Sequence, residues 1–63
     1  MSLRAELDSA LSSLELLGQR ISGLADGLTG TQDEDLALSL MDVERDLRAA
    51  SRRLERTLRD LGR

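Results

Sequence analysis

The arginines in the second half of this chain have the spacing of a binding surface. They follow one another at steps of three or four residues, which on a helix places side chains along one face. A row of guanidinium groups can bind phosphates or an acidic protein surface. The six arginines of this row are Arg45, Arg48, Arg52, Arg56, Arg59 and Arg63.

The same arginines have a second interpretation, as a solvated face stabilised within its own helix. Oppositely charged side chains four residues apart stabilise a helix without any ligand. Three such pairs are Glu44 with Arg48, Glu55 with Arg59 and Arg56 with Asp60. Because the formal net charge of the chain is −3, we favour the solvated face, with an acidic protein partner next and nucleic acid as the least favoured reading.

Few residues of this chain could perform catalysis or bind a metal. The sequence has no His, Cys or Tyr, and all nine basic residues are Arg. The usual general bases and nucleophiles are therefore missing. The acidic residues Asp33, Glu34, Asp35, Asp42 and Asp46 lack the spacing of a calcium loop or a dinuclear bundle site. We predict a protein that is not an enzyme and that has no cofactor and no metal.

The remaining composition narrows the class of partner and the location. Phe, Trp and Tyr are absent, which argues against binding nucleic acid by stacking on bases. No apolar run approaches the roughly 20 residues of a membrane span, and no secretory apolar segment is visible. The all-arginine basic set is typical of a GC-rich genome. We expect a small bacterial protein in the cytoplasm with no membrane contact.

The elements that position these side chains are predicted by the apolar residues. Apolar residues recur at alternating steps of three and four, with one interruption near residues 29–32. This pattern is typical of amphipathic helices. It predicts an all-α fold with a single domain over 1–63: one helix over about 3–28, a turn over about 29–32 and a second helix over about 33–61. Ser2 is the expected N-cap of the first helix, and Thr31 with Glu34 the expected capping box of the second.

Two long helices joined by so short a turn must run antiparallel. When Leu7 and Leu40 are placed at heptad position a, the a and d residues are predicted to pack between the two helices, with Leu24 facing Leu40 and Leu17 facing Leu47. The e positions are also mostly small or apolar, which widens the apolar stripe as in a bundle helix. We therefore expect the hairpin to form a homodimeric, coiled-coil-like four-helix bundle. Its expected oligomer interface consists of Leu11, Leu14, Leu17, Gly18, Ile21, Ala25, Ala37, Leu40, Val43, Leu47, Ser51, Leu54 and Leu58.

Three apolar residues lie outside this stripe, namely Leu16, Leu38 and Met41, and they form a candidate patch for a partner. The leading hypothesis for function is a small homo-oligomeric interaction module, such as an adaptor, regulator or accessory subunit, that presents a bundle surface to a protein partner. The alternative is a small nucleic-acid-associated regulator that uses the arginine row. A third possibility is half of a hetero-oligomer completed by a different chain.

In length and heptad spacing the chain resembles the Rop-like plasmid copy-number regulators, which are helical hairpins that dimerise into four-helix bundles. The resemblance implies the architecture. RNA binding in that family uses a polar and aromatic face of the first helix, and here the first predicted helix has no Lys, Asn or Phe. The resemblance therefore implies no RNA-binding activity.

Overall fold

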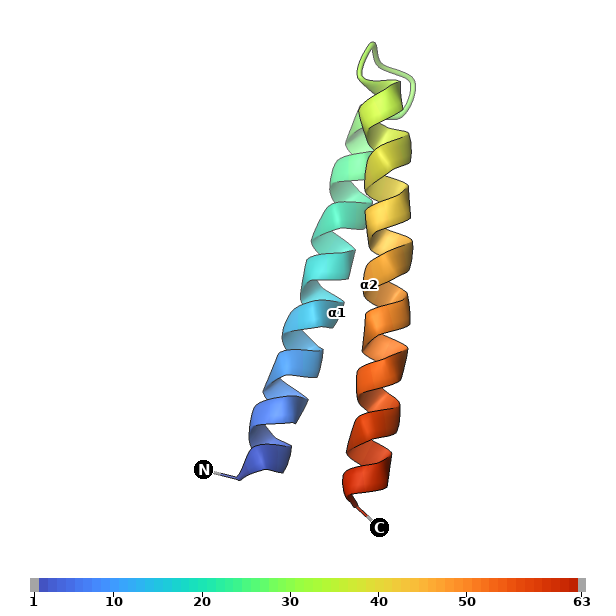
Figure 1. The fold of residues 1–63 in the computed structure, drawn as a ribbon. Helices are drawn as coiled ribbons and strands as arrows, with labels where there is room; N and C mark the ends of the chain where they lie inside the picture. The colour runs from blue at the N-terminus through green and yellow to red at the C-terminus, as the bar shows by residue number, and fades with distance from the viewer. Residues whose placement is uncertain (1, 63) are drawn as a thin grey trace.

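A computed structural model describes residues 2–62 as a helical hairpin (Figure 1). Helix α1 spans Leu3–Leu28 and helix α2 spans Glu34–Leu61. The helices run antiparallel and pack against each other, so both termini lie at the same end of an elongated molecule. The predicted all-α hairpin is confirmed, and α2 begins one residue later than expected. Neither helix, within the described residues, is long and apolar enough to cross a membrane.

The first helix begins where the sequence predicts. Ser2 has an extended backbone, with ψ of 150°, and its Oγ accepts a hydrogen bond from the Ala5 N–H at 3.1 Å. This bond satisfies one of the N–H groups that a helix leaves unpaired in its first turn.

The connection between the helices depends on one glycine. Thr29 has φ of −65° and ψ of 131°, and Gly30 has φ of 81°. The Thr31 N–H donates to the Leu28 carbonyl at 3.2 Å, which closes a type II turn over residues 28–31. The third position of this turn has positive φ, a conformation that glycine adopts at little cost.

The expected capping box at the start of α2 is wrong. The N-cap of α2 is Asp33, not Thr31, and its side chain makes no capping bond. The Thr31 hydroxyl donates to the Leu28 carbonyl and accepts from the Asp33 N–H at 3.1 Å. The Glu34 N–H donates instead to the Thr31 carbonyl at 3.2 Å. Thr31 therefore stabilises the turn, because the type II geometry places it before the helix.

The surface through which the helices pack differs from the predicted a and d seam. The most buried side chains are at e positions: Ala25 and Ala37 are each 1% exposed and Leu58 is 7% exposed. In contrast, Leu24 and Leu17, which were predicted to lie in the seam, are 57% and 43% exposed. The helices thus pack through their a and e positions. Small side chains at e allow the two backbones to approach more closely than leucines at d would.

The size of the packed side chains also explains why the helices diverge. Figure 1 shows that α1 and α2 lie closest beside the turn and separate toward the termini. Near the turn the residues at e are Ala25 and Ala37, whereas near the termini they are Leu11 and Leu58. Larger side chains at a contact increase the distance between helix axes.

Candidate interaction surfaces

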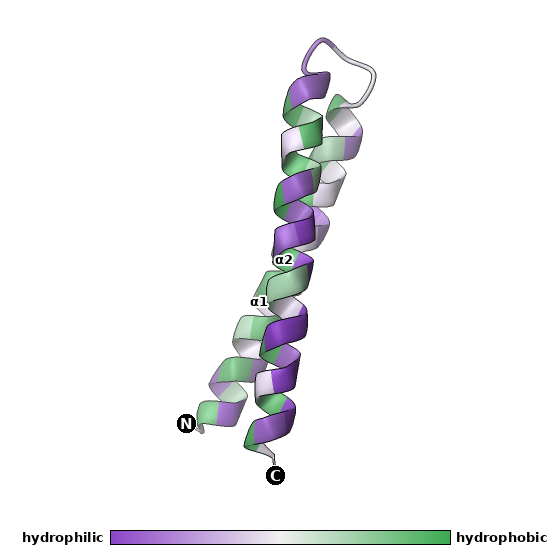
Figure 2. Ribbon diagram, turned by 45° about the vertical axis from the view of Figure 1, so that its right-hand side comes forward, coloured by the Kyte–Doolittle hydropathy of each residue, from purple (hydrophilic) through white to green (hydrophobic). Residues whose placement is uncertain are grey.

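Because the helices pack through their a and e positions, the side of the hairpin that carries the d positions is apolar and uncovered. The d positions of antiparallel helices lie on the same side, so those of α1 and α2 form one continuous surface, here called the open face. Hydrophobic residues recur along the length of both helices (Figure 2). The large exposed side chains of the open face are Leu3, Leu17, Leu24, Leu36 and Val43, between 43% and 60% exposed, and exposed Ala10, Ala50 and Thr57 complete it.

Single exposed leucines are normal on a protein surface, but a row along two helices is not. A chain of about 60 residues buries too little apolar surface to be strongly stable alone. The open face is therefore the part of this molecule whose contact with another apolar surface would stabilise it most.

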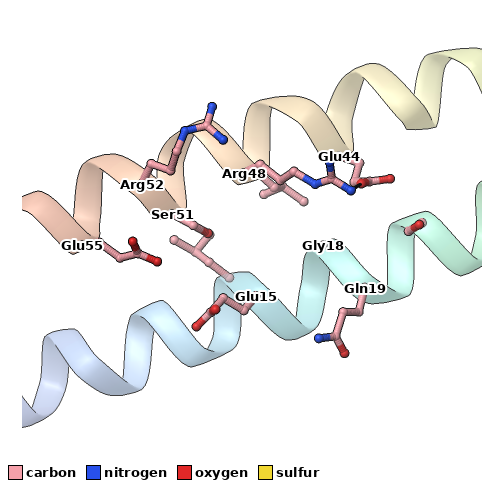
Figure 3. A pocket seen from close by; sticks show the side chains of 11 residues that line it. Glu15, Gly18, Gln19, Glu44, Arg48, Ser51, Arg52 and Glu55 are labelled. Atoms are coloured by element: carbon pink, nitrogen blue, oxygen red, sulfur yellow. Dashed lines mark ion pairs between the residues drawn. The ribbon is translucent and has the colours of Figure 1, made fainter.

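The opposite side of the hairpin carries a groove between the helices that is lined by both polar and apolar side chains (Figure 3). It has a volume of about 460 Å³ and crosses the middle of both helices. Leu14 and Leu47 contribute apolar lining, while Glu15, Arg48 and Glu55 contribute charge. The small residues Gly18 and Ser51 also line it, so no large side chain fills the space there.

One ion pair lies at the edge of this groove. The carboxylate of Glu44 pairs with the guanidinium of Arg48, as the sequence predicts. The Glu44 side chain is only 14% exposed, because its e position turns it toward α1, whereas Arg48 is 69% exposed. Arg48 thus neutralises a carboxylate that is largely withdrawn from water.

The other two predicted pairs, Glu55 with Arg59 and Arg56 with Asp60, are not formed within residues 2–62. Instead, Arg45 pairs with Asp42 at 3.0 Å on the exposed surface. Glu55 lies in a shallow hollow whose other lining residues are Arg52, Arg56 and Arg59. The arginine row is therefore interrupted by acidic side chains, and its last member, Arg63, lies outside the described residues.

The three apolar residues predicted as a partner patch do not form one surface. Leu16, Leu38 and Met41 are all exposed. However, Leu16 lies in the middle of α1, whereas Leu38 and Met41 lie one turn apart on α2 near the connection. Only Leu38 and Met41 remain as a candidate pair, on α2. Met41 lies on the same side of α2 as the groove residues Arg48 and Glu55, because these three residues are spaced seven apart.

The predicted oligomer interface is divided by the structure. Leu17 and Val43 lie on the open face, whereas Ala25, Ala37 and Leu58 are already covered within the hairpin. The expectation that a second hairpin docks against the e positions is therefore wrong for these three side chains. The remaining residues of the expected interface are partly buried within the single chain: Leu11, Leu14, Gly18, Ile21, Leu40, Leu47, Ser51 and Leu54.

Sequence reasoning missed three members of the open face, Leu3, Leu24 and Leu36. The signal that could have identified them is the small size of Ala25 and Ala37, which favours e over d as the contact between helices. In the part of the chain that the structure describes, no three acidic side chains converge as metal ligands. Comparison with protein-family models, with curated proteins and with solved structures finds no match to this chain.

Proposed function

We propose that this chain is a small non-catalytic interaction module that works as a homodimer. Two hairpins bury their open faces against each other to form a four-helix bundle, and the outer surface of the bundle binds a protein partner. The observation that supports this proposal is the uncovered row of large apolar side chains, which includes Leu17, Leu24 and Val43.

Covering the open face would stabilise a dimer. Burying a large aliphatic side chain completely is worth about 1.5–3 kcal/mol, so covering one that is half exposed is worth roughly 1 kcal/mol. Each hairpin supplies five such side chains. The apolar contact therefore favours dimers, which we expect at micromolar concentration.

A dimer formed through the open face leaves the groove side facing outward. That side carries Glu15, Glu44, Arg48 and Glu55, with Met41 toward the turn. In a protein–protein interface, charged and polar side chains typically form the rim around an apolar core. We therefore assign the partner to the groove side and expect it to be a protein with charged and apolar side chains.

The test compares two leucines with equal exposure. Leu24 on the open face and Leu38 outside it are both 57% exposed. We expect light scattering to give twice the 6.9 kDa chain mass for the unchanged protein and for Leu38→Glu. Leu24→Glu should instead give monomers, because the dimer would bury an unpaired carboxylate. A folded monomer of the unchanged chain at micromolar concentration would overturn the proposal.

A further inference from the structure

We propose that the second copy docks on the open face with its turn at the opposite end of the bundle. The two-fold axis then passes beside Ala50, and oppositely charged residues pair along both rims. This inference rests on the proposed homodimer and adds its orientation.

The rims of the open face are the g positions, which lie next to d on each helix. In an antiparallel pair of helices the g residues of one face the g residues of the other, where charged side chains pair and set orientation. The α1 rim consists of Glu6, Ser13, Arg20 and Gly27, and the α2 rim of Ser39, Asp46, Arg53 and Asp60.

The charged residues on the two rims are arranged for two-fold pairing. In α1, Glu6 and Arg20 lie at equal distances from position 13, so a two-fold axis at that position places Glu6 of each copy opposite Arg20 of the other. In α2, Asp46 and Arg53 lie at equal distances from the midpoint of positions 49 and 50, and the same pairing results.

The same two-fold axis produces the charge pairs of both helices. Since α1 ends at Leu28 and α2 begins at Glu34, residues at equal distances from position 31 lie at the same height along the hairpin. Position 13 is thus level with position 49, which is within one residue of the centre of the α2 pairs. Although the two rims lie on different helices, a single placement of the second copy brings all four pairs of opposite charge together.

The apolar residues agree with the same axis. In α1 the axis brings Ala10 of each copy beside Leu17 of the other, so each small side chain faces a large one. In α2 it brings Ala50 beside Ala50 of the second copy, and Val43 beside Thr57. The α2 helices can approach closely at the axis because both side chains there are alanine.

The four rim charges are free to pair between copies. Glu6, Arg20, Asp46 and Arg53 are all exposed. Within residues 2–62 the ion pairs of the hairpin are Asp42 with Arg45 and Glu44 with Arg48, which involve none of them.

The opposite orientation, with both turns at one end, fits the rim charges less well. It stacks α1 of one copy on α2 of the other at equal heights. Glu6 is then level with position 56, between Arg53 and Asp60 of the second copy, where attraction and repulsion offset each other. Arg20 is level with position 42, four residues from Asp46, so no rim charge lies at the same height as a partner of opposite sign.

Cysteine cross-linking tests the orientation directly, because the chain has no native Cys. In Ala50→Cys the two thiols should meet at the axis and form an interchain disulfide in high yield under mild oxidation, since disulfides require Cβ atoms about 3.5–4.5 Å apart. Ala5→Cys, at an exposed outward position, is the matched control and should remain largely monomeric on a non-reducing gel. Cross-linking between Ala10→Cys and Ala50→Cys chains, without Ala50→Cys self-linking, would overturn the orientation in favour of turns at one end.

Charge reversal on the α2 rim provides a second, independent test of the orientation. Arg53→Asp should weaken the dimer about threefold to tenfold, by placing like charges opposite each other. Adding Asp46→Arg should restore the affinity, because the two exchanged residues face each other across the axis. With both turns at one end, the nearest rim charge to Arg53 would be Glu6 and the nearest to Asp46 would be Arg20, three to four residues away along the helix. The double variant would then place like charges near each other and would not regain affinity. If the protein is a dimer but gives neither the Ala50→Cys cross-link nor the charge-reversal rescue, only the orientation is contradicted. If the cysteine variants are monomers under reducing conditions, the proposed homodimer itself is contradicted.

Discussion

At the scale of single residues, the Glu44–Arg48 pair is the most informative contact in the hairpin. Glu44 lies at an e position, where most of the other residues are small or apolar, and its side chain is 14% exposed. A carboxylate so withdrawn from water is costly unless it is paired. The Arg45–Asp42 pair is different, because both of its side chains are mostly exposed.

This difference predicts unequal effects of removing two neighbouring arginines. Arg48→Ala should lower the free energy of unfolding by about 1 kcal/mol, since it leaves Glu44 unpaired beside α1. Arg45→Ala should cost less than about 0.5 kcal/mol, as is usual for exposed pairs. Urea denaturation followed by circular dichroism measures both. Equal losses of unfolding free energy in the two variants would mean that Glu44 reaches water without its partner. As a control, Arg48→Ala should cost less when Glu44 has already been replaced by alanine.

At the scale of elements, the packing of α1 on α2 is controlled by the side chains at e. Ala25 and Ala37 allow the helices to touch near the turn, while Leu11 and Leu58 hold them apart near the termini. The helices lie closest where these side chains are smallest.

Enlarging one of these alanines should separate the helices. Ala25→Leu should lower the free energy of unfolding by about 1–3 kcal/mol, because the extra methyl groups have no space between the two helices. Ala5→Leu, at an exposed position of the same helix, should change it by less than about 0.5 kcal/mol. Thermal melting of the two variants at one protein concentration makes the comparison. A stable Ala25→Leu variant would indicate that the seam can rotate back toward d.

At the scale of the whole molecule, the charge distribution bears on the class of partner. The chain carries a formal net charge of −3. In the described part of the arginine row, Arg45 and Arg48 are paired with acids, and Arg52, Arg56 and Arg59 share their hollow with Glu55. A surface with interleaved charges attracts phosphates weakly.

We therefore predict that duplex DNA or RNA is not retained at about 0.15 M salt. Fluorescence anisotropy with a labelled duplex measures this. If the arginine row does bind phosphates, the logarithm of affinity should fall with the logarithm of salt at a slope of about −0.9 for each contact. Arg52→Glu combined with Arg56→Glu should then abolish binding without changing the helix content. Such a result would favour the nucleic-acid regulator over the protein-binding module.

The sequence by itself determined the helices and their antiparallel order. The apolar period, Ser2 and the glycine of the turn each act within a few residues, so their effect can be read along the chain. Only the tertiary structure decided the rotation of each helix about its axis, because a, d and e are mostly apolar or small. The choice among them depends on how closely two distant segments can approach. That rotation decided which leucines are covered within the hairpin and which, as Leu24 does, lie on the open face.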